Sequence, residues 1–143
     1  MENGILARRR TVGHFDIYES ASLDLYQGDL FSLTSALLGP VTALYDRAAL
    51  ISWEPPMRAA YVEHGATLTT PGTQTLLVTM EYPQSQMAGP PFSVSANDVE
   101  HLYSRHHAIL ELSREDILAS ETRLRLRGVT QLHEVCYRLT RLR

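Results

Sequence analysis

Two apolar stretches, residues 41–45 (VTALY) and 75–82 (TLLVTMEY), decide the fold that we predict for this chain. The second is nearly continuous in apolar and β-branched residues, which is typical of a strand covered on both faces of a sheet. Between them, Pro55-Pro56 predicts the start of a helix, because proline suits the first helical turn. Strand, helix and strand in this order predict a right-handed crossover with the two strands parallel.

The inner face of that helix is predicted from a repeat of side chains at helical spacing. The residues that follow this repeat are Met57, Ala60, Tyr61, His64 and Leu68. A second helix is predicted over residues 95–105, because Ser95 and Asp98 have the spacing of a capping box.

Alternating apolar and polar residues predict the remaining strands. Residues 15–19 and 23–27 should form a short hairpin, and residues 107–113 and 129–142 should form two closing strands. Since we expect no helix between the last two, they should pair as an antiparallel hairpin. The predicted fold class is therefore α/β, with an antiparallel edge on a partly parallel sheet.

Residues 1–12 are expected to be a disordered tail that precedes one domain over residues 13–143. Arg8, Arg9 and Arg10 lie in this tail. Such a triplet could contact phosphate, but a solvated charged segment is the simpler interpretation.

Composition excludes several classes of protein. The net charge of −3 favours neither nucleic acid nor an anionic membrane as a partner. No apolar run approaches the roughly 20 residues of a membrane span, and the N-terminus lacks the residue order of a signal peptide, so we expect a soluble, cytoplasmic protein. The chain has no lysine, which excludes a lysine base or Schiff base. With Cys136 as the only cysteine, neither a disulfide within the chain nor a thiolate metal cluster can form, and we expect no metal site.

Charged residues lie where ligands bind to sheets of this kind, beyond the carboxyl ends of parallel strands. Asp46 and Arg47 follow the first strand. Arg47 could grip a carboxylate or stack on a ring, or the two residues could form a local ion pair that closes a turn. Arg123, Arg125 and Arg127 alternate with leucines, which is typical of a strand with one wet cationic face, although one of them could point over the site.

Several segments together resemble the thiopurine S-methyltransferase family, most closely its bacterial branch. They are DLYQGDLF at 24–31, ALYDRAALI at 43–51, YPQSQM at 82–87 and GPPFSV at 89–94, with Gly128-Val129-Thr130 and Tyr137-Arg138-Leu139 near the end. The resemblance extends over residues 13–142. It implies a class I S-adenosylmethionine-dependent methyltransferase with a Rossmann-like sheet, of which only the carboxyl-terminal part is present and the N-terminal strands are missing.

The resemblance implies roles for five residues of this chain. Asp29, Leu30 and Arg47 match positions near the cofactor, S-adenosylmethionine. Arg47, Arg123 and Phe92 match positions near the methyl acceptor, and no residue is assigned as a catalytic acid, base or nucleophile. The implied reaction moves a methyl group from a sulfonium to a thiol, a thiopurine or a selenium- or tellurium-type acceptor. Such soft nucleophiles need positioning and desolvation more than base catalysis.

The family's first strands and its glycine-containing loop have no counterpart among these residues. Removing central strands leaves sheet edges open, and open edges favour self-association. Two interpretations therefore remain. One is a truncated methyltransferase that is weak or inactive as an isolated chain. The other is a non-catalytic module that uses the half-sheet to bind a protein.

Overall fold

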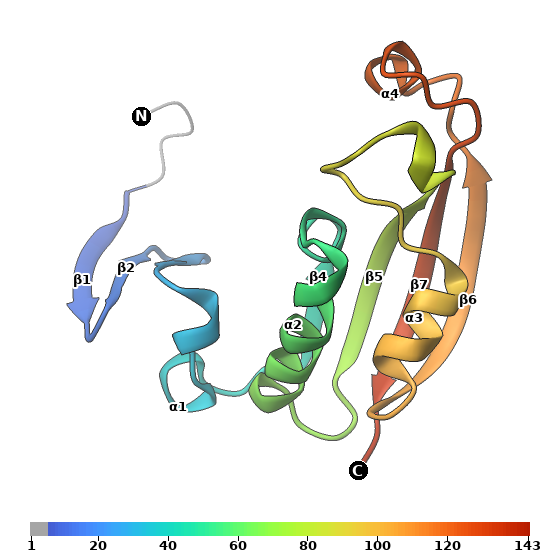
Figure 1. Ribbon diagram of the computed structural model, residues 1–143. Coiled ribbons are helices and arrows are strands. Elements are labelled where there is room, and N and C mark those ends of the chain that lie inside the picture. Colours follow the sequence, from blue (N-terminus) through green and yellow to red (C-terminus); the bar gives the residue numbers. More distant parts are fainter. Residues whose placement is uncertain (1–5) are drawn as a thin grey trace.

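The computed structural model describes residues 6–143, and their strands form two sheets (Figure 1). The strands are β1 (Arg8–Val12), β2 (Phe15–Glu19), β3 (Asp24–Gln27), β4 (Ala43–Asp46), β5 (Gln74–Glu81), β6 (His107–Asp116) and β7 (His133–Arg141). The helices are α1 (Ser35–Leu38), α2 (Pro55–Leu68), α3 (Ala96–Tyr103) and α4 (Thr122–Leu126), with short 3-10 turns η1 (Leu30–Ser32), η2 (Leu50–Ser52) and η3 (Gln84–Gln86). Over these residues, no helix is both long enough and apolar enough to cross a membrane.

The larger sheet has the strand order β4-β5-β7-β6. β4 and β5 are parallel and joined through α2, which confirms the predicted strand–helix–strand unit. β7 lies between β5 and β6 and is antiparallel to both. The chain between β6 and β7 contains α4, so these two strands pair without the direct hairpin turn that we expected.

The core lies on one face of this sheet, beneath α2 and α3 (Figure 1). Leu77, Val135 and Leu139 are fully buried there. Leu76, next to Leu77 on β5, is 40% exposed, and Tyr45 on β4 is 64% exposed. The prediction that β5 is covered on both faces is therefore wrong. A continuous apolar stretch indicates that both faces of a strand can be buried. It does not show that the described residues include a layer to cover each face.

α2 packs with part of the predicted face, because Tyr61 contacts the core and His64 and Leu68 line a cavity. Met57 is 41% exposed, whereas Val62 and the charged residue Arg58 are buried. The buried face therefore extends from the predicted residues to Arg58 and Val62, and the charge of Arg58 kept it out of an apolar repeat. α3 begins as predicted, because Ser95 and Asp98 form a full capping box.

The smaller sheet, β1-β2-β3, is antiparallel, and its β2–β3 hairpin confirms the pairing predicted for residues 15–19 and 23–27. β1 contradicts the expected disordered tail over residues 8–12, while residues 1–5 lie outside the described part of the chain. Arg9 pairs with Asp16 and Arg10 with Glu19, each at 2.6 Å across the strands. Gly13, at φ 58°, makes the tight turn that brings β1 back onto β2. The arginine triplet is thus part of a strand whose charges face acidic residues on its neighbour.

Neighbouring residues on β5 test which face of the sheet is covered. Leu77→Ala should lower the free energy of unfolding by about 2–5 kcal/mol, because it removes a fully buried side chain and leaves a cavity. Leu76→Ala, the matched control on the open face, should cost much less. Urea denaturation measures both. An equal loss for Leu76→Ala would contradict the single covered face.

Candidate functional site

Asp46, the last residue of β4, organises the segment that follows the strand. Its side chain is buried, with one carboxylate oxygen accepting hydrogen bonds from the backbone N–H groups of Ala49 (3.0 Å) and Leu50 (3.3 Å). The other oxygen accepts the Tyr61 hydroxyl of α2 at 2.7 Å. Burial, and then the charge of Asp46, raise the pKa of Tyr61, so the phenol keeps its proton and remains a donor. Asp46 therefore holds the turn after β4.

Arg47 follows Asp46 but does not form the local ion pair that was one of the two possibilities. Its guanidinium lies 3.8 Å from a carboxylate oxygen of Glu134 on β7, and its side chain is 66% exposed. A pair this long and this exposed holds the side chain weakly. Arg47 is therefore placed by the backbone that Asp46 fixes and is free to reach an incoming group at the carboxyl end of β4.

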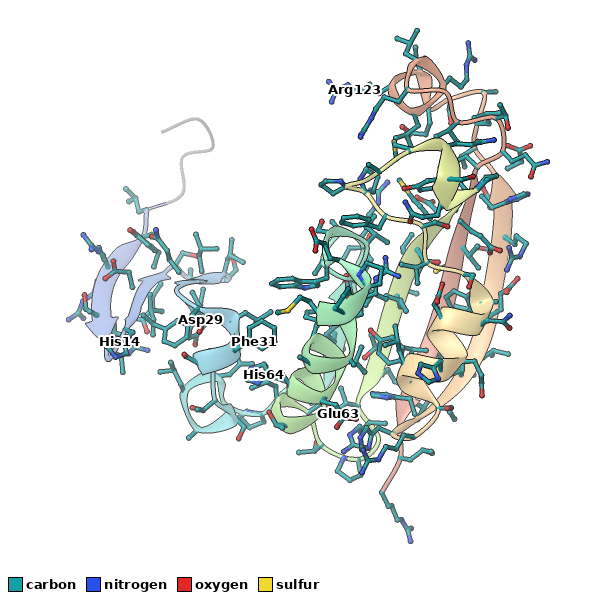
Figure 2. The ribbon with its side chains drawn as sticks, in the orientation of Figure 1. His14, Asp29, Phe31, Glu63, His64 and Arg123 are labelled. Atoms are coloured by element: carbon teal, nitrogen blue, oxygen red, sulfur yellow. The ribbon has the colours of Figure 1, made fainter. Side chains whose placement is uncertain are left out.

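Asp29 and Leu30 lie at the end of the smaller sheet, where it meets α2. The Asp29 carboxylate caps η1 by accepting from the Phe31 N–H at 3.1 Å and from the Ser32 hydroxyl at 3.0 Å. The Phe31 ring then points toward His64 (Figure 2), with ring centroids 5.7 Å apart. This cap sets the direction in which Leu30 and Phe31 leave the smaller sheet.

A cavity of about 220 Å³ lies between η1, α2 and the larger sheet. Leu30, Asp46 and Tyr61 line it together with His64 and His107. The structure therefore brings Leu30, from the predicted cofactor segment after β3, beside the turn that carries Arg47. Tyr61 and His64 were predicted on the inner face of α2, and both line the cavity. His107 was not predicted here, because it comes from β6, which is distant in sequence.

The loop after β5 carries Phe92 and is tied down at several points. The Tyr82 hydroxyl donates to the Pro91 carbonyl at 2.6 Å, and the Phe92 N–H donates to the Ile51 carbonyl at 2.7 Å. Gly89, at φ 92°, lies so close to the Phe92 ring that a Cβ there would fall 2.4 Å from a ring carbon. The loop thus fastens Phe92 to the segment after β4, which brings Phe92 and Arg47 to the same end of the sheet.

Arg123 lies on α4, exposed to solvent. The helix contradicts the expected strand with a cationic face. Figure 2 shows Arg123 at the end of the molecule beyond the loop after β5, well apart from Asp29 and Phe31. Arg127, one residue past α4, donates to the Pro90 carbonyl at 3.1 Å, so α4 contacts the Phe92 loop. Arg123 therefore lies at the end of the molecule where α4 meets the loop that carries Phe92, away from η1.

Burial of His107 makes the free energy of unfolding depend on pH. The pKa of His107 is lowered from its ordinary 6.5, first by burial and then by the charge of Arg141. The unfolded chain therefore binds more protons than the folded protein once the pH falls below about 6.5. Well above that pH, His107 does not lower the free energy of unfolding. As the pH falls from about 6.5 toward the lower pKa of the folded state, His107 destabilises the fold increasingly.

We predict that His107→Gln flattens the loss of stability between about pH 7 and pH 5, since glutamine does not titrate. The free energy of unfolding from urea denaturation at several pH values measures this. His101→Gln, which changes an exposed histidine on α3, is the control and should keep the original profile. The same flattening in both variants would show that His107 is not its source.

Comparison with known proteins gives these positions a context. A family model described as Thiopurine S-methyltransferase (TPMT) matches residues 2–142. A thiopurine S-methyltransferase of Shewanella baltica strain OS155 is 42% identical over 140 residues, which cover 98% of this chain and 64% of the relative. One from Pseudomonas fluorescens strain SBW25 is 46% identical over 127 residues, which cover 89% of this chain and 58% of the relative.

A solved structure is similar in fold. It is an arsenic(III) S-adenosylmethionine methyltransferase from Chlamydomonas reinhardtii, with a TM-score of 0.58 and 18% identity, covering 81% of this chain and 43% of that chain. The mixed sheet thus resembles that of an S-adenosylmethionine methyltransferase. The chain spans just under two thirds of the length of the Shewanella relative. The match over nearly every residue of the chain, with the motifs at β4 and after β5, shows that it belongs to the thiopurine S-methyltransferase family.

Proposed function

We propose that these residues form the carboxyl-terminal part of an S-adenosylmethionine-dependent methyltransferase that acts on a thiol, a thiopurine or a related selenium or tellurium acceptor. One observation carries the proposal. In a chain of this family, the segments after the parallel strands β4 and β5 are joined by the Phe92–Ile51 hydrogen bond and present Arg47 and Phe92 at one end of the sheet. Ligands bind at this end in sheets of this type.

The residues present fit one side of the cofactor. Asp29, Leu30 and Arg47 would contact it, with Leu30 lining the cavity beside the turn after β4. That cavity, at about 220 Å³, is smaller than the roughly 300–1,000 Å³ of common ligand sites, so other residues must complete the site. The cofactor, when bound, supplies a methyl group on a positively charged sulfur. We infer that this chain alone is weak or inactive as a methyltransferase.

Two kinds of side chain would contact the acceptor, the aromatic ring of Phe92 and the guanidinium groups of Arg47 and Arg123. Phe92 offers an aromatic surface on a loop whose position is fixed. A cationic guanidinium near the acceptor favours its thiolate form, which is the stronger nucleophile, and it does so without accepting a proton itself. Arg47 is well suited to this because Glu134 holds it only weakly. The non-catalytic module is the less favoured alternative, because the family and the solved structure of similar fold are those of methyltransferases.

The decisive experiment joins this chain to the part of a relative that its residues do not match. Fusing the N-terminal third of the Shewanella relative to this chain should give a protein that S-adenosylhomocysteine stabilises against heat, because a ligand that binds only the folded state raises the melting midpoint. This protein should also methylate a thiopurine. The 143-residue chain by itself should show little or no shift. A fusion that folds cooperatively but neither binds nor turns over would contradict the proposal.

Within that fusion, Arg47→Met and Arg123→Met should each lower kcat/KM for the thiopurine, by about tenfold if the guanidinium stabilises the developing anion. Arg125→Met is the matched control on α4, since the Arg125 guanidinium donates to the Ala119 carbonyl within its own segment. A loss for Arg125→Met as large as for Arg123→Met would remove Arg123 from the acceptor site.

We further propose that the chain self-associates through β4 and the open face of the larger sheet. Among the described residues, β4 has β5 as its one strand neighbour, so its other edge is open. The open face carries Tyr45, Leu76 and Leu110, which are 64%, 40% and 48% exposed. Open edges and apolar faces of this kind favour association.

Sedimentation velocity over a range of concentrations measures this association. Tyr45→Lys should shift the chain toward monomer, because it places a charge beside the open edge. Leu126→Lys changes a residue on α4 that is 84% exposed and serves as the control, which should leave the distribution unchanged. A chain that stays monomeric at all concentrations tested would contradict this second proposal.

A further inference from the structure

Arg58, on the first turns of α2, is the charged residue that the sequence pattern gave no reason to expect inside. It is 4% exposed. Its Nε donates to the Trp53 carbonyl at 3.2 Å, and its Nη2 donates to the Ser93 carbonyl at 3.1 Å. Trp53 belongs to the segment after β4, and Ser93 to the segment after β5. One guanidinium thus bridges the two segments that flank the proposed site.

The cost of burying this cation argues that it has a specific task. Burial lowers the pKa of Arg58, and the charge of Asp98 offsets part of that effect. A buried charge is unfavourable unless hydrogen bonds compensate, and an apolar side chain of similar volume often packs at least as well. The planar fork of arginine provides what an apolar side chain cannot, which is two donors held in a fixed relative direction.

A second link joins the same two segments, because the Phe92 N–H donates to the Ile51 carbonyl at 2.7 Å. The backbone bond joins Ile51 to Phe92, and the Arg58 bridge joins Trp53 to Ser93, close by in both segments. Two links restrain the segments against rotation about a single bond. Their combined effect is to fix Phe92 relative to the turn that carries Arg47.

We propose that Arg58 is a positioning residue that clamps residues 50–54 to residues 91–94 and thereby sets the placement of Phe92 relative to Arg47. The clamp itself is a property of this chain, while its effect on methyl transfer rests on the proposed function. Arg58 need not touch the cofactor or the acceptor for this role.

The test separates the hydrogen-bonding fork from the volume of the side chain. Arg58→Met keeps most of the volume and removes both donors. Arg58→Lys keeps the charge but replaces the fork with a single ammonium. Val62→Ala, which trims a buried residue one turn further along α2, is the control for general destabilisation. All three variants are made in the chain as it exists.

Amide hydrogen exchange, read by mass spectrometry on peptides covering residues 48–54 and 88–94, reports both segments. Arg58→Met should speed exchange in both by about fivefold or more, the factor expected for losing one hydrogen bond from a local opening equilibrium. Arg58→Lys should restore part of the protection. Val62→Ala should lower the melting midpoint without this selective effect.

Trp53 supplies a second readout, because it is the only tryptophan in the chain. Its emission should become more accessible to acrylamide in Arg58→Met and remain as in the original chain in Val62→Ala. Unchanged exchange in both segments, together with unchanged quenching in Arg58→Met, would overturn the clamp. So would an identical response in Val62→Ala.

The consequence for the reaction is measured separately in the fusion protein. Arg58→Met should raise KM for the thiopurine more than it lowers kcat, because the acceptor surface is displaced while no reacting group is removed. If the original fusion neither binds S-adenosylhomocysteine nor turns over, the proposed function fails, and hydrogen exchange still decides whether Arg58 clamps the two segments.

Discussion

The structure depends on burying one face of β5 beneath two helices. Leu77 and its neighbours on β7 pack in one cluster with residues of α2 and α3, and the parallel pairing of β4 with β5 sets where these two strands end relative to each other. The turn that carries Arg47 and the loop that carries Phe92 begin at those two ends. The turn after β4 needs the buried Asp46 carboxylate to hold it, and the loop after β5 needs the bonds of Tyr82 and Phe92. The helices thus stabilise the sheet, and the strand ends determine where the site residues lie.

The site uses charge in two different ways. Asp46 and Arg58 are buried and satisfied by hydrogen bonds, so both serve to hold backbone segments in place. Arg47 and Arg123 are exposed and weakly held, so their guanidinium groups are available to a ligand. In a chain without lysine, arginine performs both tasks. Its forked donors suit the internal bridge, and its permanent charge suits an anionic acceptor.

Local sequence predicted the elements whose signal is complete within a few residues. The parallel strand pair around α2, the hairpin of residues 15–19 and 23–27, and the capping box at Ser95 are of this kind. The predictions failed where residues distant in the sequence determine the local structure. β1 pairs with β2, where Arg9 and Arg10 meet acidic side chains. The buried face of α2 includes Arg58 because two carbonyls outside the helix accept hydrogen bonds from it. Arg47 and Phe92 were suggested by motif, but their connection through Ile51 required the fold.

The smaller sheet has a further consequence for how the molecule comes apart. Its link to α2 runs through Phe31, whose ring lies 5.6 Å from Trp53 and 5.7 Å from His64, and through Leu30 at the cavity (Figure 2). Its own strands are held together by backbone pairing and the ion pairs of β1. Because the smaller sheet is paired within itself and has few contacts with the rest of the chain, we expect it to open more easily than the β5 core. Leu30 lines the cavity and follows directly from this sheet, so such an opening would widen the cavity while the core stays folded.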